Sequence, residues 1–308
     1  MPKVSVIIPA YNHSAFIAAA IDSVLAQSFR DFEIIVVNDG SPDDTEEVLR
    51  PYIEGGQIRY FWQENQGAAA ARNHGAKMAE GELLAFLDDD DQWLPDKLEW
   101  QVKVMENSDT VVVGGSNDGD RHIRRNESSR VDIYQLLPTY IFFTSNPFGS
   151  PGQTLIRRKA FDTVDGFDQG IWGADDLDIW IRLSRLGEVR KYSRLSLFYR
   201  SHDFNASHNY NRMALNLKKV ISKNCDIEGF ENIKKLDCLG HRNLFNSFGK
   251  KMIWSAGACL FSGEFQEAIS IFKGAFKYYD NRFFKDPVLF GMLVLAVIKI
   301  PMRARRYL

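Results

Sequence analysis

Residues 83–91 read LLAFLDDDD, a short apolar run that ends in four consecutive aspartates, Asp88 to Asp91. A short and bounded apolar run is typical of a buried strand, and ligands of open α/β sheets bind at the carboxyl ends of the strands. Side chains alternate along an extended chain, so we expect Asp88 and Asp90 on one side and Asp89 and Asp91 on the other. Two carboxylates on one side suit a hard divalent cation such as Mg²⁺ or Mn²⁺. The alternative is a solvated acidic loop that also caps the next helix.

Apolar strand patterns alternate with helical patterns around this stretch. Strands are predicted at 4–8, 33–37, 58–62, 83–87, 110–113, 154–156 and 195–200, and helices at 14–27, 43–52, 68–78, 95–105 and 176–186. Continuous apolar strands that alternate with helices predict a mostly parallel, Rossmann-like α/β sheet covered on both faces. Pro9 is expected to end the first strand. From about Met213 the pattern becomes helical, so we predict an α/β domain over 1–209 and an all-helical C-terminal region over 210–308.

Charge and cysteine content limit the classes of protein to which this chain can belong. The net charge of the 308 residues is −2, which gives no sign of a nucleic-acid partner. The charge is unevenly distributed, however: 21 basic and 32 acidic residues precede Asn209, whereas 17 basic and 8 acidic residues lie from Asn209 onward. Such asymmetry suggests separate roles and a membrane-facing tail. Three cysteines without a Cys-x-x-Cys spacing favour a reducing compartment. The first residues run straight into a strand pattern without a signal peptide, so we expect a cytoplasmic protein.

Five motifs follow one another in the first two thirds of the chain. They are VSVIIPAYN at 4–12, EIIVVNDGSPDDT at 33–45, NQGAAAARNHGAKMAEGELLAFLDDDD at 65–91, DGFD at 165–168 and GADDLDIWIRL at 173–183. With this ordered set, residues 3–208 resemble the inverting family 2 glycosyltransferases of the GT-A fold. The resemblance implies transfer of a sugar from a nucleotide-diphosphate donor, with a UDP-sugar expected, to a hydroxyl of a glycan or lipid-linked acceptor in polysaccharide or glycoconjugate synthesis. No Gln-x-x-Arg-Trp sequence is present, which favours a single, non-processive transfer.

The resemblance places the nucleotide at the ends of the first strands. Pro9 and Tyr11 end the first strand, where a base could stack on Tyr11 and bond to exposed backbone. Asp39 ends the second strand, and its carboxylate can accept a hydrogen bond from a uracil-type N–H. Arg72, on the helix before the acidic strand, suits contact with base or phosphate. The alternatives are simple packing for Tyr11, a turn residue for Asp39 and a surface ion pair for Arg72.

The acidic run matches the D-x-D motif of the family. The resemblance implies that Asp88 and Asp90 hold Mn²⁺ or Mg²⁺ against the donor diphosphate, with Asp88 also near the ribose. The middle position is usually small or neutral in relatives; Asp89 adds charge to the donor site or points to solvent. Asp91 supports the site or caps the next helix. His202 lies in YRSHDFNASHN, which resembles a YR-x-H-x-x-N-x-S segment of relatives, and could reach the metal or the diphosphate; a polar loop histidine is the alternative.

Catalysis needs a base for the acceptor hydroxyl. Relatives usually carry Glu-Asp at the position of Asp175-Asp176, with the second residue as base. Asp176 is therefore the expected base, and Asp175 an expected partner for donor or acceptor. A positioned base contributes typically ~10²–10⁴-fold. The alternative is that both only cap a helix. The loop 114–130 and the segment 146–153 are expected to line the acceptor site, since loops on a rigid scaffold commonly bind substrates.

Other nucleotide-binding classes fit the sequence less well. A dehydrogenase needs G-x-G-x-x-G after the first strand and a P-loop NTPase needs G-x-x-x-x-G-K-[ST]; neither is present. A non-catalytic nucleotide-sugar-binding or scaffolding protein, acting through its helical tail, is the runner-up, and Asp176 argues against it. The apolar run Val288–Leu295 is followed by Lys299, Arg303, Arg305 and Arg306, which predicts an interfacial helix on the inner face of an anionic membrane. A core helix is the alternative.

Overall fold

A computed structural model describes residues 1–118, 134–143, 145–200 and 210–225. The chain divides into two compact units, residues 1–142 with 146–202 and residues 143–145 with 203–308. The predicted boundary near Asn209, His202 and the predicted interfacial helix lie outside the described residues. In the second unit the described element is helix α8, Tyr210–Cys225, whereas the helical pattern was expected from about Met213. Within the described residues, no helix is both long and apolar enough to cross a membrane.

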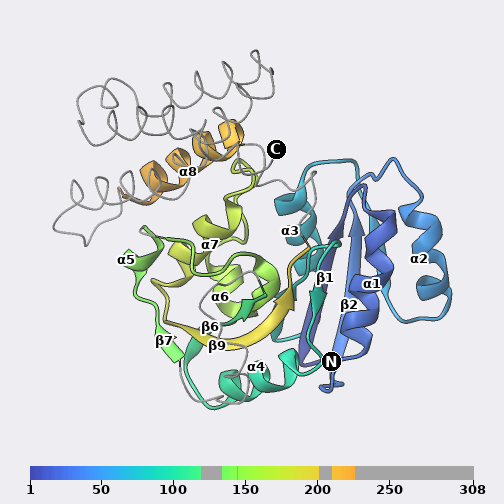
Figure 1. The fold of residues 1–308 in the computed structure, drawn as a ribbon, viewed down its shortest axis with the longest axis horizontal. Helices are drawn as coiled ribbons and strands as arrows, with labels where there is room; N and C mark the ends of the chain where they lie inside the picture. Colours follow the sequence, from blue (N-terminus) through green and yellow to red (C-terminus); the bar gives the residue numbers. More distant parts are fainter. Residues whose placement is uncertain (119–133, 144, 201–209, 226–308) are drawn as a thin grey trace, which may run out of the picture. The chain divides into compact units, whose positions relative to one another are not determined.

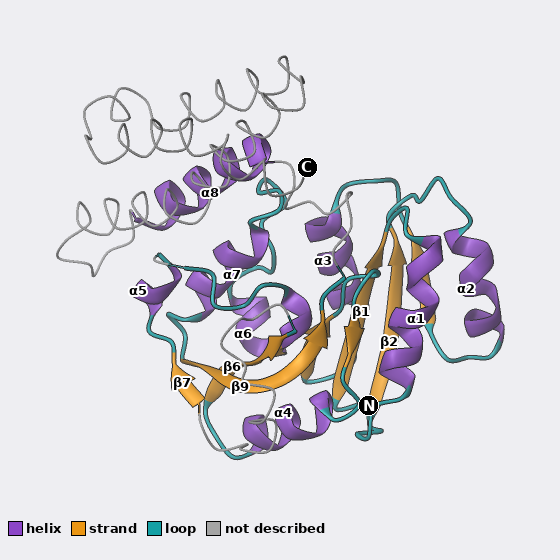
Figure 2. Cartoon of the chain, in the orientation of Figure 1, coloured by secondary structure: helices purple, strands orange, loops and turns teal. Residues whose placement is uncertain are grey.

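The first unit is built on one sheet with helices packed around it (Figures 1 and 2). Its strands follow the order β3-β2-β1-β4-β8-β6-β9-β5, with β7 paired to β9. The strands are β1 Val4–Ala10, β2 Phe32–Asn38, β3 Arg59–Trp62, β4 Leu83–Phe86, β5 Gln92–Trp93, β6 Thr110–Asn117, β7 Tyr134–Leu136, β8 Thr154–Arg157 and β9 Glu188–Phe198. The helices are α1 Ser14–Leu25, α2 Thr45–Glu54, α3 Ala68–Met78, α4 Lys97–Glu106, α5 Thr139–Phe142, α6 Arg158–Thr163 and α7 Asp175–Leu183, with a 3₁₀ turn, η1, at Pro151–Gln153.

The sheet is parallel in its first half and mixed in its second. Strands β3, β2, β1 and β4 pair in parallel, as the alternating strand and helix patterns predicted. Beyond them β8 runs antiparallel to both β4 and β6, while β6 and β9 are parallel again. The carboxyl ends of β1, β2 and β4 therefore meet at one edge, and this edge carries the motif residues.

Helices cover both faces of the parallel half, which explains its unbroken apolar strands. Side chains of β1 alternate between the faces. Val6 and Ile8 belong to the core cluster that includes Ile17 and Ile21 of α1. Ile7 points to the opposite face under α3, where a Cβ added to Gly75 would collide with it. Strands buried on both faces must be apolar throughout, and β1 is fully buried along its length.

Pro9 does not end β1; the strand continues through it to Ala10. The Ile7 carbonyl accepts from Leu87 N, so Ile7 faces β4, and Pro9, two residues on, faces the same side. The ladder with β4 stops at Ile7 and Phe86. The missing N–H of Pro9 therefore interrupts no pairing, which is the condition under which a strand tolerates proline.

The four aspartates form a turn and are not extended, so the predicted alternation of their side chains is wrong. Asp91 N donates to Asp88 O at 3.1 Å, which closes a four-residue turn. The chain then forms the short strand β5, which pairs with the end of β9. In this turn the four aspartates contact different partners: Asp88 contacts Arg72, Asp89 contacts Tyr11 N, and Asp90 and Asp91 contact Arg200.

Candidate active site

Arg72 joins two of the predicted site regions. Its guanidinium donates from one terminal nitrogen to Asp88 Oδ1 at 2.6 Å and from the other to Asp175 Oδ2 at 2.8 Å. The same group lies over the Phe167 ring, 5.4 Å from its centroid. Arg72 is only 7% exposed. Burial lowers the pKa of Arg72, but the charges of Asp88 and Asp175 outweigh it and the pKa is raised. The alternative for Arg72, an ion pair at the surface, is therefore wrong, because the guanidinium that pairs with Asp88 and Asp175 is buried.

Ser150 approaches Asp88 from the other side. Its hydroxyl lies 3.2 Å from Asp88 Oδ2. Ser150 is held in turn by Gln153, whose Oε1 accepts from Ser150 N at 3.1 Å and whose Nε2 donates to Gly115 O at 3.0 Å. The short 3₁₀ turn η1 after Ser150 thus fixes a hydroxyl against the carboxylate that begins the acidic turn.

Asp90 and Asp91 are tied to Arg200, which follows the end of β9. Arg200 Nε donates to the Asp90 carbonyl at 3.0 Å, and Arg200 N donates to Asp91 Oδ1 at 2.9 Å. The second oxygen of Asp91 is buried and has no hydrogen-bond partner among the described residues. Burial, followed by the charges of Asp88 and Asp90, raises the pKa of Asp91 to about 9. Asp91 therefore supports the turn from within and does not cap α4.

Asp89 faces the loop between β1 and α1. Its Oδ2 accepts from Tyr11 N at 2.9 Å, and its Oδ1 lies 2.8 Å from His13 Nδ1. The hydrogen bond to Asp89 is the main reason that the pKa of His13 is raised. The carboxylate is buried, so it does not point to solvent. The Tyr11 side chain, 45% exposed, remains available to stack on a base.

Asp39 lies at the end of β2 and holds the loop that leads into α3. Its Oδ1 accepts from Gln63 Nε2 at 2.7 Å and from Gln66 N at 2.9 Å, and its Oδ2 accepts from Gly67 N at 2.8 Å. A carboxylate offers about four lone-pair positions. The uracil contact predicted for Asp39 would therefore use the remaining position on Oδ2.

Asp175 and Asp176 begin α7. Asp175 turns toward Arg72, whereas Asp176 Oδ2 accepts from Asn146 Nδ2 at 2.7 Å. Burial, followed by the charge of Asp175, raises the pKa of Asp176 to about 7. A carboxyl with a pKa near neutrality can take up a proton during a reaction at physiological pH. The two neighbours thus have different environments, one in an ion pair and one beside the segment predicted to line the acceptor site.

The DGFD motif anchors the Phe167 ring beneath Arg72. Asn73 on α3 donates to Phe167 O at 2.7 Å and accepts from Phe167 N at 2.9 Å. Gly166 has φ +66°, and a Cβ there would lie 2.5 Å from Asn73 Oδ1. Only glycine adopts this conformation freely and leaves room for the amide.

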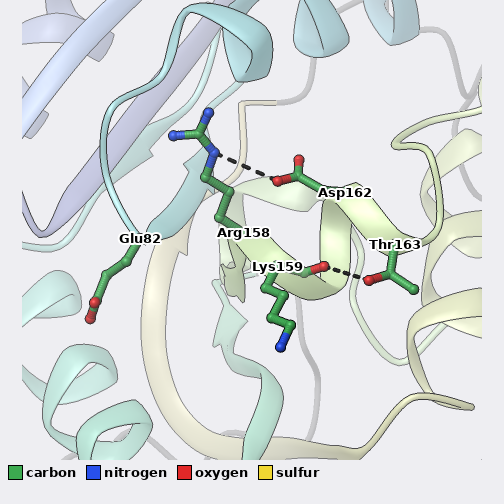
Figure 3. A pocket seen from close by; sticks show the side chains of 5 residues that line it. All are labelled: Glu82, Arg158, Lys159, Asp162 and Thr163. Carbon is green, nitrogen blue, oxygen red and sulfur yellow. Dashed lines mark hydrogen bonds and ion pairs between the residues drawn. The ribbon is translucent and has the colours of Figure 1, made fainter.

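An open depression lies at the opposite end of β4. Its volume is about 580 Å³, and it is lined by Glu82, Arg158, Lys159, Asp162 and Thr163 (Figure 3). Glu82 precedes β4, whereas Asp88 follows it. The Arg158 guanidinium points to Asp162 at 3.7 Å. None of the predicted site residues lines this depression; Arg158 pairs with Asp162 within it, and Glu82 pairs with Lys3.

A family model described as Glycosyl transferase family 2 matches residues 5–165, more than half of the chain. The chain belongs to glycosyl transferase family 2. An uncharacterized glycosyltransferase of Rickettsia bellii is 35% identical over 204 residues, which are 61% of this chain and 28% of that protein. This family 2 chain thus spans less than a third of the length of that relative.

Two solved structures share the fold of this family 2 protein. S. aureus TarS 1-349 in complex with UDP-GlcNAc gives a TM-score of 0.65 at 18% identity, over 80% of this chain and 73% of that one. The mannosyltransferase PcManGT from Pyrobaculum calidifontis, in complex with GDP-Man and Mn²⁺, gives a TM-score of 0.60 at 20% identity. The match covers 97% of this chain and 87% of that one. The predicted GT-A-like α/β fold is confirmed, with a mixed sheet.

The acidic turn of this family 2 protein fits a divalent cation. It presents carboxylate oxygens, which Mg²⁺ and Mn²⁺ prefer, and it includes the unpartnered Asp91 oxygen. In the described part of the chain, no three His, Cys, Asp or Glu side chains cluster as a complete metal site. One or two carboxylates together with substrate phosphates are a usual Mg²⁺ site in phosphate-binding enzymes. Asp88 and Asp90 remain the predicted protein ligands.

Three contacts of the site were not predicted from the sequence: His13 with Asp89, Ser150 with Asp88, and Asn146 with Asp176. His13 directly follows the Tyr-Asn that ends the first motif, and Asn146 and Ser150 lie in the segment expected to line the acceptor site. Their position next to a motif or in this segment was the available signal that these residues belong to the site. It could not identify their partners, which lie 30 to 76 residues away in the sequence.

Proposed function

We propose that this protein is a metal-dependent, inverting, single-transfer glycosyltransferase that uses a UDP-sugar donor and a hydroxyl acceptor of a glycan or lipid-linked glycan. The observation that carries the proposal is the Arg72 bridge. It joins Asp88, the predicted partner of the diphosphate, to Asp175 at distances of 2.6 and 2.8 Å. Asp176 follows Asp175 directly, so the predicted leaving-group site and the predicted base lie close together.

In this mechanism the acceptor hydroxyl attacks the anomeric carbon of the donor sugar. Asp176 takes the hydroxyl proton as the new C–O bond forms. The bond from the anomeric carbon to the diphosphate oxygen breaks, and the nucleoside diphosphate leaves with its electron pair. Attack from the face opposite to the leaving group inverts the anomeric centre. The pKa of Asp176, raised to about 7, suits a base that is regenerated each turnover.

The other residues bind and orient the donor. Tyr11 and Asp39 take the base at the ends of β1 and β2, and the backbone around Pro9 borders it. Asp88 and Asp90 would hold the cation, which when bound neutralises charge that develops on the diphosphate, an effect worth several kcal/mol. Arg72 donates to Asp88 and orients its carboxylate. Asn146 contacts the predicted base Asp176, which supports the assignment of this part of segment 146–153 to the acceptor side. Ser150 contacts Asp88 on the donor side.

The solved neighbours support the choice of donor and cation. TarS is complexed with UDP-GlcNAc and PcManGT with GDP-Man and Mn²⁺, so both bind a nucleotide diphosphate sugar in the same fold. Asp39 Oδ2 accepts one hydrogen bond, from Gly67 N, and we assign its second acceptor position to the uracil N–H. Peripheral attachment to a membrane through residues 288–306 stays a prediction, as these residues lie outside the described ranges.

The proposal is tested by a screen of sugar nucleotides with and without Mn²⁺, using full-length wild type and Asp176→Asn. We expect transfer by wild type that chelation abolishes, and at least a ~100-fold loss of kcat in Asp176→Asn with UDP affinity retained. Asp162→Asn is the matched control, because Asp162 is 61% exposed and lies in the remote depression. Full activity of Asp176→Asn would contradict the assignment of the base. Donor binding by wild type without any turnover would favour the alternative, a nucleotide-sugar-binding or scaffolding protein.

A further inference from the structure

The side chain of His13 is directed at the acidic turn. His13 precedes α1 at the N-cap position, yet its side chain makes no capping hydrogen bond to the described residues of the helix. Its backbone carbonyl accepts the first helical bonds, from Phe16 N and Ile17 N. The imidazole reaches Asp89 Oδ1 at 2.8 Å, across 76 residues of sequence. The ring is therefore used for a long-range contact and not for the helix that follows it.

Asp89 makes two hydrogen bonds to this one loop. One oxygen accepts from Tyr11 N at 2.9 Å and the other is bonded to His13. The carboxylate is 6% exposed, and a buried carboxylate is costly unless its oxygens are bonded. The pair thus fastens the acidic turn to the β1–α1 loop at two points that are two residues apart.

The opposite side of the loop is held by the segment after β2. Asn12 N donates to Ser41 Oγ at 3.2 Å, and Ser14 N donates to Asp43 Oδ2 at 2.8 Å. Asn12 has φ +59°, a conformation that non-glycine residues adopt at a cost unless their surroundings hold it. The loop is therefore clamped between two elements, and Asp89 with His13 forms the clamp on the side of the acidic turn.

We propose that His13 is a positioning residue which, through Asp89, holds the base-binding loop 11–13 and the acidic turn 88–91 in register for one nucleotide diphosphate. The inference rests on the proposed function, which assigns the base to Tyr11 and the diphosphate to Asp88 and Asp90. Asp89 then acts on the donor through the protein backbone, by fixing Tyr11 N and the turn, and not by direct contact.

The test compares His13→Ala, Asp89→Ser and the double variant with wild type. Because His13 acts through Asp89, we expect His13→Ala to weaken UDP binding and raise the donor KM about tenfold, with kcat changed less than about twofold. In the Asp89→Ser background the same change should alter UDP affinity by less than about twofold. His13→Asn keeps an N–H donor near the position of Nδ1 and should restore most of the affinity. UDP affinity is measured by calorimetry with and without Mn²⁺.

Amide hydrogen exchange gives a readout that needs no nucleotide. Both single variants should speed exchange of the Tyr11 amide, whose bond to Asp89 would be weakened or lost. Tyr52→Phe is the matched control: it removes the 2.9 Å bond from Tyr52 to Asp22 on α1 and should leave UDP affinity and Tyr11 exchange unchanged. A merely destabilised protein would lose active fraction, and so kcat, at constant KM.

The possible failures are distinguishable. If wild type binds UDP and His13→Ala binds it equally well, the positioning role is wrong while the proposed function stands. Additive losses in the double variant, or Tyr11 exchange that neither substitution changes, would also overturn the role. If wild type binds no UDP in the presence of Mn²⁺, the proposed function fails and the positioning role fails with it.

Discussion

At the scale of single residues, Asp176 predicts how activity depends on pH. Burial and the neighbouring Asp175 raise its pKa to about 7. Only the ionised carboxylate can accept the proton, so kcat/KM should fall about tenfold per pH unit below that value and level off above it. The profile is measured from pH 5.5 to 9 at saturating Mn²⁺. Asp175→Asn should move the midpoint to lower pH, because it removes a neighbouring negative charge. A flat profile across this range would show that another group limits the rate.

The identities of the motif aspartates could be predicted from the sequence, but their pairing could not. Asp88, Arg72 and Asp176 stand out because the ordered motifs single them out. The Arg72–Asp175 bond spans 103 residues, and such a contact depends on how α3 and α7 pack, which no local pattern records. The same holds for His13, whose neighbours in sequence suggest a loop but not a partner for Asp89.

At the scale of elements, the turn before Phe167 predicts a stability difference. Gly166→Ala should destabilise the protein by roughly 2–4 kcal/mol, since it combines a left-handed backbone with a collision against Asn73. Gly56→Ala is the control: its φ is +63°, but nothing lies within 4 Å of the added Cβ. That substitution should cost only about 1 kcal/mol. Denaturant unfolding of both variants separates the steric contribution from the backbone contribution.

The same turn connects stability to the site. Displacement of Asn73 would shift Phe167, whose ring lies under the Arg72 guanidinium. Gly166→Ala should therefore also raise the donor KM, whereas Gly56→Ala should not. Equal losses of stability in the two variants would mean that the amide of Asn73 moves away without cost.

Most helices and strands could be placed from the sequence, but the longest strand was predicted only in part: β9 spans Glu188–Phe198, whereas the pattern predicted 195–200. Helix α3 has the predicted bounds, 68–78, because its run of alanines favours a helix and Gly67 directly precedes it. Strands β5 and β7 have two and three residues, too few to show a period, and they exist because β9 offers a partner. The turn of the four aspartates was missed for a related reason: a hydrogen bond from Asp91 to Asp88 competes with extension, and the sequence pattern of the run fits both.

At the scale of the whole molecule, the distribution of charge predicts how ligands bind. Residues before Asn209 hold 21 basic and 32 acidic side chains, and the acidic turn lies where the diphosphate is expected. Anionic UDP alone should bind weakly against these carboxylates, and Mn²⁺ alone finds no complete cluster of ligands in the described residues. Each ligand supplies what the other lacks, so their binding should be strongly cooperative.

Thermal unfolding tests this cooperativity directly. At 100 times Kd a ligand stabilises the folded state by about 2.7 kcal/mol, which corresponds to a rise in Tm of roughly 5–10 °C for a unit of this size. We expect that rise with UDP and Mn²⁺ together, and only about 1–2 °C with either alone. Asp90→Asn should lower the joint effect without abolishing folding, and the remote Asp162→Asn should preserve it. If UDP stabilised the protein equally in the presence of a chelator, the diphosphate would be held by the protein alone, and the cation assigned to Asp88 and Asp90 would have no place in donor binding.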